Sequence, residues 1–222
     1  MSSAPGAPPV RIWNLPLDEA ISAVMDRLGR VRRRRIEGTL HRAMYEKFLA
    51  SPVAVHPDPL YFAGSRAGRR FTPRMGPAGL YLSFDPSTPP AELRTVVFEH
   101  GFPVSTEEHD PIVTVAVRTV IHRVLDLTDA STRRSLGLTV ADLRADWERG
   151  QDEYLAGRGP MPATQLLALT AHASGLFAGI KYPSARTRFG INLVVFPDRL
   201  EKSHDYLEVI DSTKRYYQRL PP

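Results

Sequence analysis

Three side chains that could act together on a charged sugar phosphate occur at equal spacing along the chain. Arg70, Tyr81 and Glu92 are separated by steps of eleven residues, and Ser184 follows far downstream in a turn before an apolar segment. A guanidinium can bind two phosphate oxygens at once. One fixed carboxylate can stabilise positive charge that develops on a sugar in a transition state. The set therefore suits a phosphate-bearing substrate whose cleavage builds positive charge on its sugar.

Each of these residues also has a purely structural interpretation. Arg70, and Arg42 earlier in the chain, could be solvated surface guanidinium groups. Tyr81 lies between two leucines on an expected strand, where a core tyrosine with a bonded hydroxyl is common. Glu92 could complement a helix dipole, and Ser184 could be an ordinary turn serine. It is the joint occurrence and order of these residues that favours a functional site.

The sequence argues against several other kinds of site. It has no cysteine, which excludes disulfides, thiolate metal sites and cysteine nucleophiles. Its seven histidines show neither HxH nor HExxH spacing, so we expect no metal site. The glycine-rich stretch 64–68 matches neither the P-loop nor the dinucleotide fingerprint, so a bound nucleotide would not lie in a Rossmann unit. No histidine lies near Ser184 in the sequence, which gives a Ser-His-Asp triad little support.

The composition is that of one globular domain. At 222 residues the chain can bury one good core, and its 42% apolar and 24% charged residues are ordinary values. No apolar run approaches the roughly 18 residues of a membrane span, and the first residues do not form a secretory signal. Together with the absence of cysteine, this leads us to expect a cytoplasmic protein with no membrane segment. The net charge of +5 favours anionic partners such as nucleotides, nucleic acids or an acidic protein.

Periodicity predicts an α+β domain with a mixed or largely antiparallel sheet. An amphipathic helix is expected over 17–31, capped by Asn14 and preceded by a disordered lead-in. Further helices are expected at 139–147 and 162–174, and strands at 39–43, 79–84, 112–121, 176–182, 192–196 and 206–210. Unequal helices separate the strands, which does not fit strictly alternating βαβ units.

One further helix bears directly on the site. It is expected to begin at Ser87 or Thr88 and to present Val96 and Val97 on its apolar face until Gly101 ends it. Glu92 would then lie in its first turn, where it could face a ligand held against the preceding strand.

A dense basic run, Arg30 with Arg32–Arg35, follows the first helix and suits a helix C-terminus. It has no interleaved aromatic residues and no recognisable DNA-reading motif. We expect it to face solvent or a partner protein, with no direct sequence-specific contact to nucleic acid. Any affinity for DNA would come from counterion release and would fall steeply with salt.

The order of five short motifs resembles the RES domain family, which is named for its arginine, glutamate and serine. The motifs are Leu40-His41-Arg42, Gly68-Arg69-Arg70-Phe71, Leu80-Tyr81-Leu82-Ser83, Ala91-Glu92 and Tyr182-Pro183-Ser184-Ala185. In the arginine loop, Arg69 replaces the family's second glycine, and Thr72 stands where asparagine or histidine is usual. Neither departure removes a key group.

The resemblance sets the expected domain limits. It covers residues 38–212 as the RES domain, after an N-terminal part of lead-in plus helix over 1–37 and before a C-terminal tail over 213–222. It implies a single domain with a split sheet like that of ADP-ribosyltransferases.

The resemblance also implies a function. Characterised RES members are toxins of bacterial toxin–antitoxin pairs that destroy NAD⁺, and their partner is an Xre-type helix-turn-helix antitoxin with which they form a hetero-oligomer. NAD⁺ would be the substrate and no cofactor would be needed, with water or inorganic phosphate as the acceptor of the ADP-ribosyl group. Arg42 and Arg70 would bind the pyrophosphate, and Tyr81 would position the nicotinamide ribose or ring. Glu92 would stabilise the cationic sugar, and Ser184 would bind the ribose or nicotinamide end.

Two alternatives stay open at the level of sequence. The same residues could serve a protein ADP-ribosyltransferase, which would also release nicotinamide but would label a protein. The chain could instead be a non-catalytic module that binds a partner protein or nucleic acid. The intact set of arginine, tyrosine, glutamate and serine argues against this second alternative.

Overall fold

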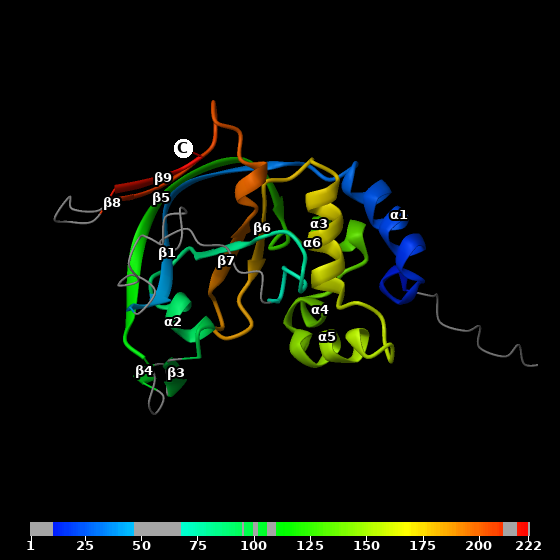
Figure 1. Ribbon diagram of the computed structural model, residues 1–222, viewed down its shortest axis with the longest axis horizontal. Helices are drawn as coiled ribbons and strands as arrows, with labels where there is room; N and C mark the ends of the chain where they lie inside the picture. Colours follow the sequence, from blue (N-terminus) through cyan, green and yellow to red (C-terminus); the bar gives the residue numbers. More distant parts are fainter. Residues whose placement is uncertain are drawn as a thin grey trace, which may run out of the picture.

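A strongly curved sheet lies on one side of the molecule and a group of helices on the other (Figure 1). The computed structural model describes residues 11–46, 68–94, 96–99, 102–105, 110–210 and 217–221. The expected disordered lead-in and most of the expected loop between the first two strands lie outside these ranges.

Seven strands form the main sheet, in the order β1-β2-β7-β6-β5-β8-β9. They are β1 (Arg34–Tyr45), β2 (Leu80–Ser83), β5 (Ile112–Asp126), β6 (Gly179–Pro183), β7 (Ile191–Val195), β8 (Tyr206–Ile210) and β9 (Tyr217–Leu220), and a separate hairpin contains β3 (Val96–Glu99) and β4 (Phe102–Ser105). The pairing of β5 with β6 is parallel and the other pairings are antiparallel. The expected α+β class with a mixed, largely antiparallel sheet is therefore confirmed.

The sheet closes on itself, which differs from the expected split sheet. Strand β1 pairs with β2 on one side and also runs along β5, from Arg34 opposite Val124 to Tyr45 opposite Ile112. The end of β5 then pairs with β6, so that β1, β2, β7, β6 and β5 form a barrel-like ring. Strand β1 is longer than the sequence pattern indicated, which was a strand of five residues over 39–43.

The helices pack on one side of this ring (Figure 1). They are α1 (Leu17–Leu28), α3 (Ala130–Leu136), α4 (Val140–Arg144), α5 (Trp147–Leu155) and α6 (Ala163–Ala173), while the short α2 (Thr88–Glu92) lies apart from them, beside β1. The helix expected over 139–147 is in fact two helices, because Ala145 is extended and Asp146 caps a new start at Trp147.

Strand β7 separates two apolar cores because its side chains alternate between its faces. Leu193 and Val195 pack with strand residues such as Leu80, whereas Val194 and Phe196 pack beneath the helices. Tyr81 is directly opposite Val194, so it shares the helix-facing side of the sheet. The register of the central strands thus determines which side chains point toward the helices.

The amphipathic N-terminal helix is confirmed, with corrections at both ends. Ala20, Val24 and Leu28 are its buried stripe. The expected cap at Asn14 is wrong, because Asn14 ends a short 3₁₀ turn and Pro16 is the residue that precedes α1. The helix ends at Leu28 rather than at residue 31, so the basic run does not belong to its last turn.

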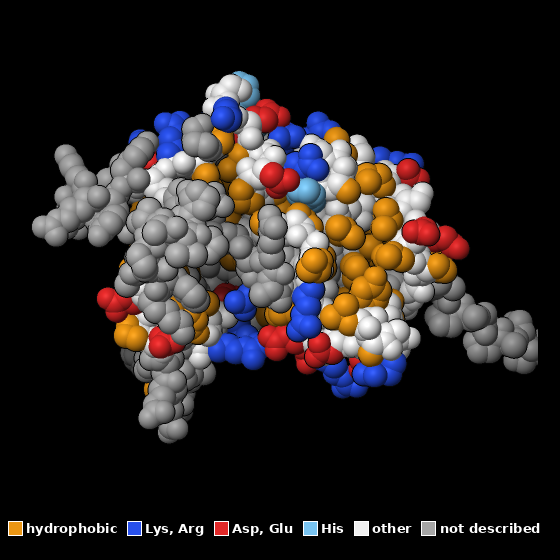
Figure 2. Space-filling model, in the orientation of Figure 1, with side chains coloured by type: hydrophobic (Ala, Val, Ile, Leu, Met, Phe, Trp, Pro, Cys, Tyr) orange, Lys and Arg blue, Asp and Glu red, His pale blue; other side chains and the backbone are white. Residues whose placement is uncertain are grey.

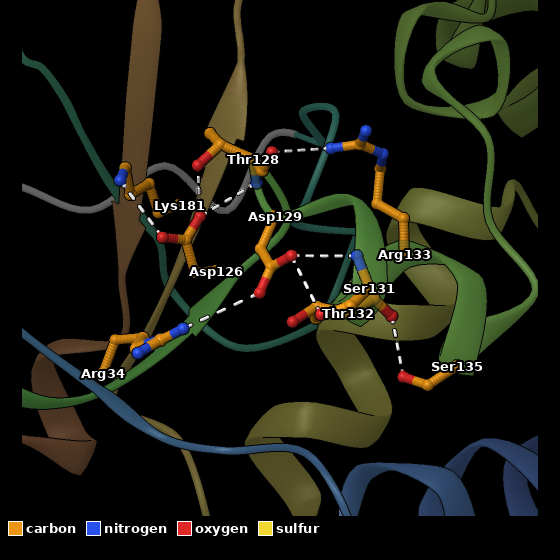
Figure 3. Close-up of polar contacts among 9 residues, drawn as sticks. All are labelled: Arg34, Asp126, Thr128, Asp129, Ser131, Thr132, Arg133, Ser135 and Lys181. Atoms are coloured by element: carbon orange, nitrogen blue, oxygen red, sulfur yellow. Dashed lines mark hydrogen bonds and ion pairs between the residues drawn. The ribbon is translucent and has the colours of Figure 1, made fainter.

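Two of the five arginines in that basic run belong to the sheet and form ion pairs there. Arg34 and Arg35 begin β1, and Arg34 lies 3.7 Å from a carboxylate oxygen of Asp129 (Figure 3). The same carboxylate caps α3 by accepting the backbone N–H of Ser131 at 2.8 Å. Next to it, Lys181 of β6 binds Asp126 of β5 at 3.1 Å. These contacts tie β1, β5, β6 and α3 together where the ring closes.

The close approach of β6 to β7 can be tested at Gly179. A Cβ atom added at Gly179 would lie 2.7 Å from the backbone oxygen of Val194, so Gly179→Ala must displace backbone. We expect it to lower the free energy of unfolding by about 1–3 kcal/mol, as overpacking does. Gly29→Ala is the matched control, since its Cβ would make only ordinary contacts and its φ is −58°. Equal midpoints for the two variants in chemical denaturation would contradict this close approach of β6 to β7.

Candidate active site

A cavity of about 350 Å³ opens between β1, β2, α2, the start of α5 and the β6–β7 hairpin. Four of the five residues singled out in the sequence line it, namely Arg42, Arg70, Tyr81 and Glu92, and Ser184 lies directly behind Glu92. Ligand sites in proteins typically have volumes of roughly 300–1,000 Å³, so the cavity is of a useful size. The fold thus brings together residues that are distant in the sequence.

Glu92 occupies the last position of α2 rather than its first turn, which corrects the expectation from sequence. Prolines 89 and 90 do lie in the first turn, but the helix has only five residues. It stops because Arg94 adopts a left-handed conformation with φ of 61°. Residues 96–99 accordingly form β3 and not a continued helix.

The position of Glu92 rules out the simple dipole explanation for it. A carboxylate is favoured at a helix N-terminus and disfavoured at a C-terminus, where the orphan carbonyls lie. Other groups must therefore hold its charge. Two side chains from the β6–β7 hairpin do so, because Ser184 Oγ donates a hydrogen bond to Glu92 Oε1 at 2.6 Å and Asn192 Nδ2 donates to the same oxygen at 2.7 Å.

All of the hydrogen bonds seen for the Ser184 hydroxyl are to Glu92 and to the backbone of its own turn. Its side chain is completely buried, and its Oγ accepts the backbone N–H groups of Arg186 and Thr187 at 3.0 and 3.1 Å. A hydroxyl has one proton, and that of Ser184 goes to Glu92. The geometry therefore supports a role in holding the carboxylate, rather than the direct contact with ribose or nicotinamide expected from the sequence.

Tyr81 anchors the loop that carries Arg70. Its hydroxyl accepts the backbone N–H of Phe71 at 3.1 Å and lies 3.1 Å from Thr72 Oγ1. Burial raises the pKa of Tyr81 to about 12, so the phenol is neutral at physiological pH. Its ring lines the cavity while its hydroxyl faces the loop.

Arg70 is fixed by backbone carbonyls at the end of α4. Its Nη1 atom donates to the carbonyl oxygens of Leu143 and Ala145, at 2.7 and 2.9 Å. Burial lowers the pKa of Arg70, and the nearby Tyr182 and Glu92 partly oppose that shift. The guanidinium stays charged at neutral pH, since an arginine starts from a pKa above 12. A cation is thus held rigidly in the same cavity as the Glu92 carboxylate.

Positive charge exceeds negative charge around the cavity. Arg42 extends from β1, and burial lowers its pKa to about 10, which still leaves it protonated at neutral pH. Three further arginines and one further glutamate line the walls, namely Arg69, Arg94, Arg186 and Glu148. Figure 2 shows basic side chains gathered beside acidic ones at the lower edge of the molecule, between the positions of α2 and α5. This balance suits an anionic ligand.

Several of these lining residues were not identified from the sequence. Asn192 could have been suspected from the sequence, because it is a polar residue in an otherwise apolar strand. Nothing in the sequence pointed to Arg94 and Glu148. They meet only in the folded chain, where an ion pair of 2.5 Å joins the end of α2 to the start of α5. Trp147 and Tyr182 also line the cavity, and neither was given a role from the sequence.

Neither a metal cluster nor a membrane helix occurs in the parts of the chain that the structure describes. Those parts contain no group of three or more histidine, cysteine, aspartate or glutamate side chains that could hold a metal ion. Within the same parts, no helix is long and apolar enough to cross a membrane.

Comparisons with known proteins show a family and a similar fold. A family model described as the RES domain matches residues 39–217. A chain of the crystal structure of the M. tuberculosis MbcT–MbcA toxin–antitoxin complex is similar in fold, with a TM-score of 0.57 and 17% sequence identity. The similarity covers 92% of this chain and 94% of that chain. A comparison with curated proteins finds no match.

The anchoring role of Tyr81 can be tested without any substrate. Tyr81→Phe removes the hydroxyl that binds Phe71 and Thr72, and leaves a buried N–H without its acceptor. We expect a loss of about 1–3 kcal/mol in the free energy of unfolding, the usual cost of such a group. Tyr154→Phe serves as the control, because no hydrogen bond of its hydroxyl is seen among the described residues and Tyr154 is only partly buried. Equal denaturation midpoints for the two variants would show that the hydroxyl of Tyr81 does not anchor the loop that carries Arg70.

Proposed function

Because the chain belongs to the RES domain family, we propose that it is the toxin of a bacterial toxin–antitoxin pair and that it cleaves the bond between nicotinamide and ribose in NAD⁺. The family match extends over all five residues singled out in the sequence, from Arg42 to Ser184. The fold similarity to a chain from a toxin–antitoxin complex supports the same proposal.

The observation that carries the proposal is a single carboxylate, Glu92, held rigidly at the wall of a cationic cavity. Nicotinamide is already cationic in NAD⁺ and leaves as a neutral molecule, so its departure needs no proton donor. Most glycosidases, in contrast, need a second carboxyl group as a general acid. The other cavity glutamate, Glu148, is bound to Arg94 and is therefore not arranged as such an acid.

In the proposed reaction the bond between the anomeric carbon and the pyridine nitrogen breaks, and its electron pair goes to nicotinamide. Positive charge then develops on the ribose, and the fixed carboxylate of Glu92 stabilises it electrostatically. Water or inorganic phosphate attacks the anomeric carbon to form the new bond, and water loses a proton as it does so. The chain then acts as a glycohydrolase or a phosphorylase, depending on the acceptor.

The arginines supply the binding energy for the rest of NAD⁺. The pyrophosphate is a dianion, and Arg42 and Arg70 are two partly buried cations of the cavity. Charge-assisted hydrogen bonds to phosphate are roughly twice as strong as neutral ones, and a guanidinium can make two in parallel. Because carbonyl oxygens fix Arg70 before substrate arrives, little freedom is lost on binding.

The proposal includes a partner. An Xre-type helix-turn-helix antitoxin would bind the toxin and block the cavity, and it would supply the base contacts of the complex to DNA. The similar solved structure is that of a toxin–antitoxin complex, which supports the presence of a protein partner.

The role of Glu92 gives the first test. Glu92→Gln removes the charge with little change in volume, and removal of one preorganised electrostatic group typically lowers kcat about 10²–10³-fold. We expect cells that express the wild-type chain alone to lose NAD⁺ and stop growing, and cells that express Glu92→Gln to grow normally. Glu153→Gln, a change at an exposed surface ion pair on α5, is the matched control and should remain toxic. Equal NAD⁺ loss with Glu92→Gln would eliminate the proposed role of this carboxylate.

The geometry of Arg70 gives the second test. Arg70→Lys keeps the charge but cannot both bind two backbone carbonyls and present a planar fork to phosphate. We expect kcat/KM for NAD⁺ to fall at least about tenfold, which corresponds to the loss of one good hydrogen bond to a charged group. Arg149→Lys, on the exposed face of α5, should leave kcat/KM unchanged. Steady-state kinetics that do not separate the two variants would place the pyrophosphate elsewhere.

A further inference from the structure

Three polar side chains lie side by side across three neighbouring strands beneath Glu92. The register pairs Asn192 of β7 with Ser83 of β2 on one side and with Tyr182 of β6 on the other. Directly opposite residues share a face of the sheet, so all three side chains project toward the same side. Their exposed fractions are only 2%, 3% and 4%, for Asn192, Ser83 and Tyr182 respectively. A buried polar row of this kind is costly unless every member is hydrogen-bonded.

The hydrogen bonds of this row have only one consistent direction. An ionised carboxylate can only accept, so the Asn192 amide must present its nitrogen to Glu92, and the bond from Nδ2 to Oε1 is 2.7 Å long. The amide oxygen then faces Ser83, whose hydroxyl must donate, and this bond is 2.6 Å long. A flipped amide would turn its oxygen toward the carboxylate and lose that bond, so Glu92 sets the orientation of the amide, and the Ser83 hydroxyl holds the amide oxygen in it.

Tyr182 completes the row as a neutral group. Burial raises the pKa of the Tyr182 hydroxyl well above its usual value, and the neighbouring Tyr81 and Glu92 raise it further, while a hydrogen bond with Asn192 acts in the opposite direction. The phenol ring also packs against Phe71, with ring centroids 4.3 Å apart. Asn192 is thus held from both sides within the sheet.

We infer that Asn192, held by Ser83, is a positioning residue that selects which oxygen of Glu92 meets the substrate. The bonds from Asn192 and Ser184 both end on Oε1, which leaves Oε2 for the cationic ribose. This inference rests on the proposed function, because it assigns the orientation of the carboxylate in that reaction. It adds Asn192 and Ser83 to the residues on which turnover depends, although neither touches the reacting atoms.

The kinetic test separates positioning from packing. Asn192→Asp keeps the volume but replaces the donor with an acceptor, Asn192→Ala removes the whole amide, and Ser83→Ala removes the hydroxyl that holds the amide oxygen. We expect kcat to fall roughly 10²-fold for Asn192→Asp and at least about tenfold for Ser83→Ala, in line with the cost of a misplaced catalytic group. KM for NAD⁺ should change by less than about threefold, since the arginines bind the pyrophosphate. Thr170→Val, which removes a buried hydroxyl in α6, should leave kcat unchanged.

Packing alone gives a different ranking of the variants. If Asn192 only fills space, Asn192→Asp keeps a kcat close to that of the wild type and Asn192→Ala is the more damaged variant. That ranking, or a kcat for Ser83→Ala equal to that of the wild type, overturns the inference. Melting temperatures recorded with the kinetics identify any variant that fails to fold, and Ser83→Ala then remains as the independent variant.

A second measurement needs no substrate, so it separates failure of this inference from failure of the proposed function. In ¹⁵N-labelled wild-type protein, the Asn192 side-chain amide is identified as the signal that disappears in Asn192→Asp. We expect one of its two protons to exchange slowly with solvent, and to lose that protection in Glu92→Ala. An amide signal that Glu92→Ala leaves unchanged overturns the positioning contact. A wild-type protein that shows the contact but does not consume NAD⁺ refutes the proposed function alone.

Discussion

The site depends on the hydrogen bonds that hold one partly buried carboxylate at the wrong end of a helix for a negative charge. Glu92 closes α2, where the helix dipole opposes its charge, and partial burial removes much of its hydration. The β6–β7 hairpin compensates by aiming two donors at a single oxygen, one from its turn and one from its second strand. The carboxylate is thereby fixed before any substrate binds, which is the condition under which electrostatic catalysis is strongest.

The cation opposite this carboxylate is positioned by a different device. The loop that carries Arg70 is fastened to the sheet by the hydroxyl of Tyr81, and the guanidinium is fastened to the last carbonyls of α4. The sheet and the helices therefore both take part in placing one side chain. The ion pair of Arg94 with Glu148 makes a third connection, from the end of α2 to the start of α5. The cavity is held on both sides, so a shift of the helices relative to the sheet would disturb both charges at once.

Most of the side chains singled out in the sequence line one cavity, but their hydrogen-bond partners could not be predicted from it. Periodicity correctly indicated the strand that carries Tyr81, the strand that carries Asn192 and the last long helix, because each has a clear apolar face. The role of Ser184 could not be read in this way. It depends on which atoms the turn places near Oγ, and those atoms come from the register of β6 and β7.

Two wrong predictions about the extent of an element have a common physical origin. The helix that carries Glu92 was expected to continue through Val96, and β1 was expected to be short. In both cases local preference was overridden by conditions that only the folded chain supplies, namely the left-handed turn at Arg94 and the long pairing of β1 with β5. Closure of the sheet is a consequence of that pairing. The apolar pattern of β1 alone cannot show which strand it pairs with.

The measurement that tests the account most directly is a product analysis of NAD⁺ incubated with the purified chain, with and without inorganic phosphate. The account predicts release of one free nicotinamide for each NAD⁺ consumed, with the pyrophosphate left intact. The second product would be ADP-ribose when water is the acceptor, or its anomeric phosphate when phosphate is the acceptor. Unchanged NAD⁺ in the presence of folded protein, or cleavage of the pyrophosphate to mononucleotides, would contradict the central claim that Glu92 and the arginines form a site for breaking the nicotinamide–ribose bond.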